Sequence, residues 1–357
     1  MKKIIFNVVF ICFGCIYFLG CMTQDVYTQD IYIGGFEHNS QRLGIARYWL
    51  NGKPFSISNG NYFTAIRSMF INGSDVYAAG YEYSGKNNNF QPYFKNTIAM
   101  YWKNGIRFPL TDGNYDATAR SIFIVGEDVY IAGYEKSGVG GNNVAKYWKN
   151  GNVVNLSNTQ NNAYANSIFV VGTDIYVAGY ESNGPNGNFI AKYWKNSVAV
   201  NLSDGRRSSY CNSIFVSGSD VYVAGTEFYN YARYESIAKY WKNGVAIDLM
   251  DNSSNGEATS IFVVGTDIYV AGKEKKKNEI SSSAKYWKNG QEFILSDGRS
   301  NADAYSVFVV DNNIYVVGAQ HNGRNWVGKY WKNGIESTIS NEQFNAILYS
   351  VFVVRKQ

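Results

Sequence analysis

A Tyr-Trp pair recurs seven times along this chain, and its regular spacing constrains the fold more than any other feature. The tryptophans follow one another at intervals of 53, 46, 46, 47, 46 and 44 residues, at Trp49, Trp102, Trp148, Trp194, Trp241, Trp287 and Trp331. Repeats of about 40–50 residues are typical of β-propellers, whose blades are four-stranded sheets set around a channel. Seven copies therefore predict an all-β, seven-bladed propeller of four-stranded antiparallel blades.

The unit at residues 167–205 divides into four expected strands. These lie at 167–171 and 175–181, in a third segment that ends at Trp194, and at 198–202. Most copies place Asn-Gly between the third and fourth strands, where a type I′ turn needs two residues with positive φ. Successive residues of a strand point to opposite faces. Each Tyr-Trp pair is therefore predicted to press one ring against each neighbouring blade.

The two ends of the chain resemble two parts of one blade. The first copy begins at "DIYIGGFE" (30–37), which matches a second strand with no first strand before it. The last residues, 349–357, match a first strand with nothing after it. We expect these segments to pair, because a ring closed in this way leaves no exposed sheet edge. The predicted propeller spans residues 30–357.

The repeat unit resembles kelch repeats. It has a hairpin ending in "IYVAGYE", a variable loop, a strand that carries an aromatic pair, and a short outer strand. The resemblance covers about residues 27–357 and implies a propeller. The kelch Gly-Gly doublet survives only as Gly34-Gly35, and Tyr and Trp are adjacent where kelch repeats separate them. Because proteins with this scaffold range from binding adaptors to copper oxidases, the resemblance implies no particular function.

The first residues are predicted to be a secretory signal. Lys2 and Lys3 precede the apolar run "IIFNVVFICFGCIYFLG", which ends at Cys21. "FLGC" resembles a bacterial lipobox, which implies a signal peptide at 1–21, a diacylated Cys21, a tether at 22–29 and a lipid anchor in the bacterial cell envelope. An uncleaved membrane anchor and cleavage elsewhere remain open, although a bilayer span needs about 20 apolar residues.

Charge and cysteine content narrow the possible partners. The chain has 33 Lys and Arg against 28 Asp and Glu; removing 1–21, with two lysines and no acid, leaves a net charge of +3. That charge is too small to indicate nucleic-acid binding. Cys211 is the one cysteine in the predicted propeller, so no internal disulfide is expected and the core must stabilise the fold. We expect a monomer without a cofactor.

Several charges repeat with the blades. Six copies end the second strand with Glu and the seventh with Gln320, and six carry a base before the Tyr-Trp pair where the second copy has Met100. Cross-strand Glu–base pairs are the favoured interpretation, and a ring of acids that binds a cation is the alternative. A further set of aspartates is expected to accept hydrogen bonds from backbone amides in the first hairpin: Asp75, Asp128, Asp174, Asp220 and Asp267.

Function is expected where the copies differ. Because strands alternate in direction, the tight turns share one face of the ring, and the second-to-third loops share the other with the blade connections. The variable loops at 83–99, 228–238 and 321–328 mix aromatic, Asn, Arg and Gly residues, which suits contacts with a sugar or a peptide. In the last of these, an exposed Trp326 is the leading contact candidate, with Arg324 beside it.

A second variable set is placed first on the innermost strands, around the channel mouth on the variable face: Arg67, Arg120, Asn166, Asn212, Thr259, Tyr305 and Tyr349. The two arginines come from adjacent blades and could receive an anion. His38 and His321 come from neighbouring units and are weak candidates to share a metal ion, because no further ligand has suitable spacing.

No catalytic motif is recognisable in the sequence. We therefore expect a binding module that recognises a protein or a glycan through the variable loops. A propeller enzyme with its site at the channel mouth and a scaffold for envelope assembly are the alternatives.

Overall fold

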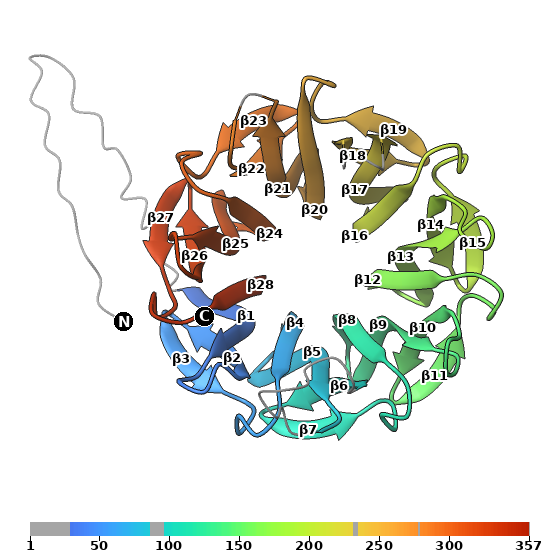
Figure 1. Cartoon of the computed structure of the whole chain (residues 1–357), viewed down its shortest axis with the longest axis horizontal. Helices are drawn as coiled ribbons and strands as arrows, with labels where there is room; N and C mark the ends of the chain where they lie inside the picture. Colours follow the sequence, from blue (N-terminus) through green and yellow to red (C-terminus); the bar gives the residue numbers. More distant parts are fainter. Residues whose placement is uncertain (1–28, 86–95, 231–234, 278, 357) are drawn as a thin grey trace, which may run out of the picture.

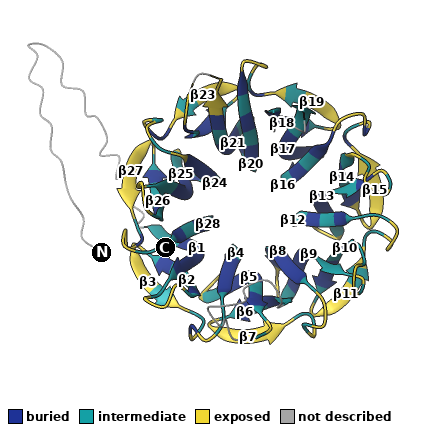
Figure 2. Cartoon of the chain, in the orientation of Figure 1, coloured by how far each residue is buried: buried dark blue, intermediate teal, exposed yellow. Residues whose placement is uncertain are grey.

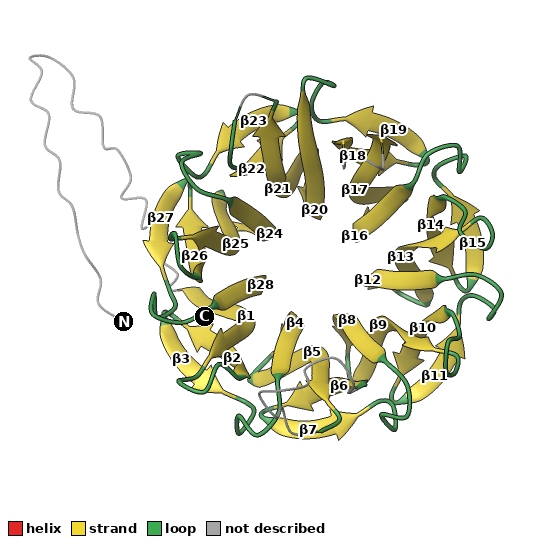
Figure 3. Cartoon of the chain, viewed as in Figure 1, coloured by secondary structure: helices red, strands yellow, loops and turns green. Residues whose placement is uncertain are grey.

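A computed structural model describes residues 29–85, 96–230, 235–277 and 279–356. These residues form 28 strands in seven four-stranded antiparallel sheets. The sheets stand radially around a central axis (Figure 1), and no helix occurs in this part of the chain (Figure 3). The predicted seven-bladed propeller is confirmed.

Each blade contributes one strand to the channel wall and one to the rim. The innermost strands are β28 (Ala346–Arg355), β4 (Thr64–Asn72), β8 (Ala117–Val125), β12 (Ala163–Val171), β16 (Ser209–Ser217), β20 (Ser254–Val264) and β24 (Ala302–Val310). The second strands are β1 (Gln29–His38), β5 (Asp75–Tyr83), β9 (Asp128–Lys136), β13 (Asp174–Ser182), β17 (Asp220–Asn230), β21 (Asp267–Lys276) and β25 (Asn313–His321).

The two outer strands follow in the same order. The third strands are β2 (Gly44–Leu50), β6 (Thr97–Lys103), β10 (Asn143–Lys149), β14 (Phe189–Lys195), β18 (Glu235–Lys242), β22 (Ser283–Lys288) and β26 (Trp326–Lys332). The fourth strands are β3 (Lys53–Ser56), β7 (Ile106–Pro109), β11 (Asn152–Asn155), β15 (Val198–Asn201), β19 (Val245–Asp248), β23 (Gln291–Ile294) and β27 (Ile335–Thr338). Burial falls from the inner strands to the rim (Figure 2).

The terminal segments close the ring. β28 pairs antiparallel with β1, in a register that sets Gln29 opposite Arg355. Lys356 Nζ lies 2.8 Å from Asp30 Oδ1, and Gln29 donates a hydrogen bond of 2.9 Å to Asp311 in the neighbouring blade. The expected pairing is confirmed, and the described part of β1 includes Gln29, which precedes the predicted start of the propeller at residue 30.

The Tyr-Trp pairs wedge neighbouring blades, as predicted. Trp148 is 1% exposed and packs against Tyr77, Ala79 and Ala99 of the preceding blade. Tyr147 faces the other way and shares a hydrophobic cluster with Trp194 of the following blade. All seven tryptophans of the repeat are buried.

The two tight turns of each blade lie on one face, here called the hairpin face. Asn150 and Gly151 have φ of 53° and 81°, as a type I′ turn requires. The Asn150 side chain accepts a hydrogen bond of 2.8 Å from Val129 N and donates one of 2.7 Å to Asp128. The expected role of the turn aspartates was therefore wrong. Asp128 binds the Asn150 amide and the Lys149 ammonium, at 3.0 Å, while Asn150 satisfies the backbone amide.

The opposite face, here called the loop face, carries the second-to-third loops and the blade connections. His38 N donates a hydrogen bond of 2.8 Å to Asn345 O. This bond joins the end of β1, where the loop to β2 starts, to the connection between β27 and β28. Asn142 and Asn188 make the same kind of bond through their side chains, to Thr159 O and Gly205 O. Parts of the 83–99 and 228–238 loops lie outside the described residues.

A serine ring connects the free edges of the innermost strands. Each hydroxyl accepts a hydrogen bond from a backbone amide of an adjacent innermost strand, as Ser121 does from Ile168 N at 3.2 Å. An unpaired strand-edge amide is costly once buried, so these bonds stabilise the contact between blades. The ring consists of Ser68, Ser121, Ser167, Ser213, Ser260, Ser306 and Ser350.

A closed ring of phenylalanines lies two residues further along the same strands. Neighbouring ring centroids are 4.7–5.1 Å apart around the whole circle, a separation typical of favourable aromatic contacts. The members are Phe70, Phe123, Phe169, Phe215, Phe262, Phe308 and Phe352. The repeated "S-x-F" of the inner strands is therefore a structural signature.

Candidate functional site

The variable inner-strand set occupies a β-bulge in every blade. In β12 the register shifts between Ala165 and Ser167, so Asn166 has no partner in the ladder, and the same shift occurs at each equivalent residue. The sequence predicted that these variable residues are the first residues of the innermost strands, and this prediction is wrong. The strand continues through the bulge, so β12 begins at Ala163, four residues before the expected 167. The bulge re-aims these side chains.

Three bulge residues have a structural role that the arginines lack. Asn166 donates a hydrogen bond of 2.9 Å to Cys211 O of the next blade, Asn212 donates one of 2.8 Å to Ala258 O, and Thr259 donates one of 2.8 Å to Ala304 O. Arg67 and Arg120 stand at the same position. The Nε of each is buried without a hydrogen-bond partner among the described residues.

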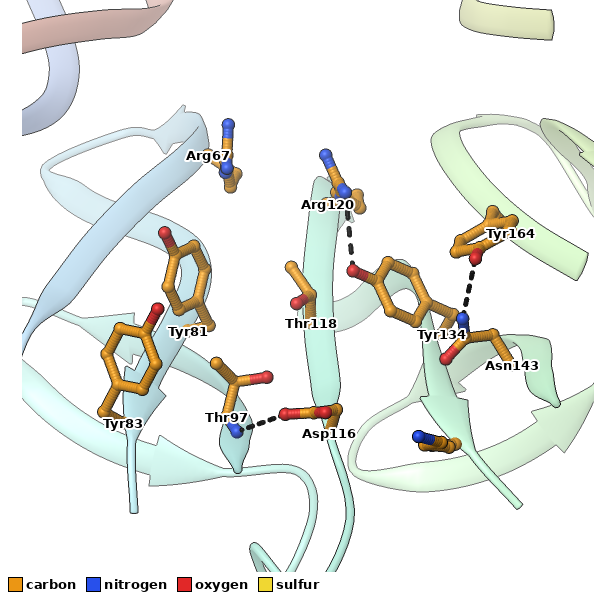
Figure 4. Close-up of a pocket in the computed structure, with 11 residues that line it drawn as sticks. Arg67, Tyr81, Tyr83, Thr97, Asp116, Thr118, Arg120, Tyr134, Asn143 and Tyr164 are labelled. Carbon is orange, nitrogen blue, oxygen red and sulfur yellow. Dashed lines mark hydrogen bonds between the residues drawn. The ribbon is translucent and has the colours of Figure 1, made fainter. Parts of the chain in front are cut away.

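The four remaining bulge residues form one row on four successive innermost strands, β24, β28, β4 and β8. Tyr305 and Tyr349 have ring centroids 5.2 Å apart, and the Arg67 guanidinium lies 4.1 Å from the Tyr349 ring centroid. Arg120 follows Arg67 on the next innermost strand, and both point the same way (Figure 4). The structure thus brings together four of the residues that the sequence singled out.

A cavity of about 360 Å³ opens beside the two arginines; it is lined by the second and third blades and by Tyr164 of the fourth. Thr97, Asp116, Lys136 and Asn143 lie at strand ends on the loop face, which places the opening there. The full lining is Arg67, Tyr81, Tyr83, Thr97, Asp116, Thr118, Arg120, Tyr134, Lys136, Asn143 and Tyr164 (Figure 4). We call this the arginine–tyrosine pocket.

Positive charge dominates the arginine–tyrosine pocket. Arg120 donates a hydrogen bond of 3.5 Å to Tyr134, and its guanidinium lies 5.4 Å from that ring's centroid. Burial is the largest single influence on the pKa of Tyr134 and would raise it, but the charges of Arg120 and Arg67, together with hydrogen bonds to Thr118 and Arg120, lower that pKa below its ordinary value. Neither Arg67 nor Arg120 forms an ion pair within the described part of the chain.

The sequence prediction missed Tyr81 and Tyr134, although a signal for them was present. They stand one residue before the repeated Glu of the second strand, where the other copies have Phe36, Tyr180, Thr226, Lys273 and Ala319. That column varies as much as the bulge column does. Comparing it between copies would have drawn attention to this column, although Tyr180 of the fourth blade shares the tyrosine.

Arg324 and Trp326 lie at a different place on the loop face. Trp326 begins β26 and is partly buried; its ring meets the His321 ring edge-on, with centroids 5.6 Å apart. It was predicted to be an exposed loop residue, which is wrong because the strand extends through it. Arg324 lines a second cavity of about 400 Å³ with His38, Ser40, Arg42, Asn325, Gln343, Phe344 and Asn345.

The two histidines occupy separate environments. His38 packs against Phe36 and Phe63, and burial together with the charge of Arg42 lowers its pKa. His321 Nδ1 accepts a hydrogen bond of 3.2 Å from Gly323 N. No group of three His, Cys, Asp or Glu side chains that could hold a metal ion occurs among the residues described.

The repeated Glu side chains form the predicted cross-strand pairs. Glu135 and Glu181 lie 2.5 Å from Lys146 and Lys192 respectively, and Arg47–Glu37, Lys239–Glu227 and Lys285–Glu274 pair in the same way. In the second blade, where Met100 replaces the base, Glu82 pairs instead with Arg107 of β7, at 2.5 Å. In the seventh, where Gln320 replaces the acid, Lys329 pairs with Glu336 of β27, at 2.7 Å.

The Glu82–Arg107 arrangement of the second blade should also form in another blade if the same residues are introduced there. Replacing Lys192→Met leaves the largely buried Glu181 without its partner and should lower the free energy of unfolding by about 1–3 kcal/mol. Ala199 faces Trp194 in the register that sets Arg107 opposite Trp102. The double variant K192M/A199R should therefore recover most of the loss in urea denaturation. An equal loss in the single and double variants would contradict the pairing.

Tyrosine burial predicts sensitivity to alkali. Burial raises the pKa of Tyr305 and of Tyr349 above the usual value near 10. The folded state therefore keeps phenol protons that the unfolded state releases above about pH 10, and the stability these groups contribute is lost as pH rises further. The melting temperature should be constant from about pH 7 to 9 and should fall above about pH 10. Tyr305→Phe should reduce that dependence, and an unchanged slope would contradict the assignment.

Comparisons with known proteins support the fold only. No protein-family model matches this chain, and no curated protein matches it in sequence. Among solved structures, the β-propeller domain of the Trilobed protease from Pyrococcus furiosus shares 10% identity at a TM-score of 0.49, over 88% of this chain and 98% of that one. Pyrococcus horikoshii acylaminoacyl peptidase shares 11% identity at a TM-score of 0.54, over 88% of this chain and 51% of that one.

The likeness to the peptidase shows a propeller and carries no activity over to this chain. With no family model matching, the kelch resemblance rests on the repeat motif alone.

Proposed function

We propose that this chain is a lipid-anchored binding module of a bacterial cell envelope, and that it takes a protein or glycan ligand on the loop face at the arginine–tyrosine pocket. The observation that carries this proposal is the exchange of a structural residue for a charged one. Where other blades place Asn or Thr in an inter-blade hydrogen bond, two adjacent blades place Arg67 and Arg120 against a polar cavity. Variable residues presented by a rigid scaffold are typical of binding sites.

Binding fits this pocket better than hydrolysis does. Its lining includes one carboxylate, Asp116, which accepts a hydrogen bond of 3.1 Å from Thr97 N, and it includes no His, Ser or Cys. Acid–base catalysis by two carboxylates needs two unequal environments, and a nucleophile needs a base beside it. Cys211 is fully buried in the core, and burial raises its pKa, which keeps the thiol protonated.

The anchor rests on the sequence around Cys21, which lies outside the described residues. No helix in the described part of the chain is long and apolar enough to span a bilayer. Cys21→Ala should abolish labelling by a radioactive fatty acid and move the protein to the soluble fraction. Retained labelling would contradict lipidation at this cysteine.

The binding role is tested by crosslinking the anchored protein to its envelope neighbours, beside a glycan array. The variant R67N/R120N should lose the captured partner or glycan. Thr259→Asn is the matched control, because Asn occupies the same bulge in two other blades. Capture by the double variant at the wild-type level would contradict the assignment of the pocket.

A further inference from the structure

We propose that the arginine–tyrosine pocket binds a carboxylate-bearing sugar unit of an acidic saccharide, with Arg67 and Arg120 receiving the carboxylate. This inference rests on the proposed function and names the chemical class of its ligand. It follows from three features of the pocket: arginines without counter-ions among the described residues, a polar lining, and tyrosine side chains that carry hydroxyls in that lining.

The arginines are prepared for an anion that the described part of the chain does not supply. Each has a buried Nε without a partner among the described residues, and their neighbours are aromatic rings. Arginine stacked on an aromatic ring keeps its outward N–H groups free and fixed in direction. Such a guanidinium binds a carboxylate through two parallel hydrogen bonds.

The charge balance favours an anion as well. Arg67, Arg120 and Lys136 give the lining three positive charges against one negative charge from Asp116. The Asp116 carboxylate already accepts the amide hydrogen of Thr97. Uncompensated positive charge in a partly enclosed site attracts anions more strongly than the same charge on an open surface.

The remaining lining fits a ligand that is polar on all sides. Every side chain of the pocket carries a hydroxyl, amide or charged group, and six of the eleven carry a hydroxyl: Tyr81, Tyr83, Tyr134, Tyr164, Thr97 and Thr118. An apolar peptide side chain would require an apolar subsite, which this lining does not provide. The volume of about 360 Å³ lies at the lower end of the roughly 300–1,000 Å³ typical of small-molecule sites.

The pocket is also pre-formed on its far side. Asn143 donates a hydrogen bond of 2.7 Å to the Tyr164 hydroxyl, and the Tyr134 and Tyr164 rings meet edge-on with centroids 4.8 Å apart. The rings are thereby held in place, so little side-chain ordering is required on binding. Fixed hydroxyls and ring faces beside a carboxylate receptor match an acidic sugar ring.

The test is calorimetry and an array of uronic-acid and sialic-acid oligosaccharides, each beside its methyl ester and its neutral parent, with sodium phosphate as a separate arm. We expect at least one acid to bind and its ester and neutral parent to bind at least tenfold more weakly. R67N/R120N should lose at least thirtyfold in affinity for that acid. Its melting temperature should not fall, because Asn can restore the inter-blade bond seen at Asn166 and Asn212.

Each other outcome overturns this inference in a recognisable way. Equal binding of acid and ester would show a glycan site without carboxylate recognition, and binding of phosphate alone would show an anion site that takes no sugar. Crosslinked protein capture that needs both arginines, with no saccharide bound, would leave the proposed function standing and remove this ligand class. If the wild-type protein captured no partner and bound no saccharide, both the proposed function and the proposed ligand class would be contradicted.

Discussion

Truncation after Asn345, which removes β28, is expected to abolish the cooperative unfolding transition of the whole propeller. β28 supplies the innermost strand of the closing blade and buries Leu348, Val351 and Val353 in the core shared with Trp49. It also supplies Ser350, which accepts the Met69 amide and so joins the first blade to the second. The truncated ring would expose the edge of β1, a template for aggregation.

The measurement is calorimetry together with size-exclusion chromatography. The control variant lacks only residues 356 and 357 and loses the exposed Lys356–Asp30 pair, which should cost at most about 1 kcal/mol. A stronger control is a circular permutant. Because Gln29 faces Arg355 in the ladder, a short turn can join them, and new ends can open at Gly140 between β9 and β10. The permutant should unfold cooperatively, whereas a wild-type transition in the truncated chain would contradict the closure.

Trp148→Ala is expected to lower the free energy of unfolding by about 3–5 kcal/mol. The indole is 1% exposed and fills the contact between the second and third blades, so its removal leaves a cavity that two rigid sheets cannot close. Val153→Ala is the matched control, since Val153 lies in the same blade and is 53% exposed. That control should stay within about 0.5 kcal/mol of wild type in urea denaturation.

The same loss of stability is expected at the equivalent tryptophans of the other blades. Every tryptophan of the Tyr-Trp pairs is equally buried, so Trp194→Ala and Trp241→Ala should each cost a similar amount. A loss below 1 kcal/mol at any one of these positions would show that its blades do not pack as described.

The architecture was predictable because each of its determinants is local or periodic in the sequence. The Trp spacing fixes the number of blades, and the incomplete units at the two ends imply closure by β28 and β1. The Asn-Gly turns were predictable from the positive φ they require. Even Asn196-Ser197, where Gly is absent, adopts the same turn, with φ of 49° and 68°.

The pocket was only half predictable. Arg67 and Arg120 stood out as unlike members of one repeat column, but a bulge depends on the register between two strands, which the pattern of one strand does not specify. Trp326 was misassigned because a long loop and an extended strand end look alike in sequence. The serine and phenylalanine rings join residues about 45 positions apart, and their connection becomes visible only when the blades are set in a circle.

A crystal structure of the propeller soaked with an acidic oligosaccharide chosen from the array would locate the ligand directly. We predict electron density for a sugar ring in the arginine–tyrosine pocket, with its carboxylate within hydrogen-bond distance of Arg67 and Arg120. Density on the hairpin face, or in the pocket with the carboxylate turned away from both arginines, would contradict this prediction.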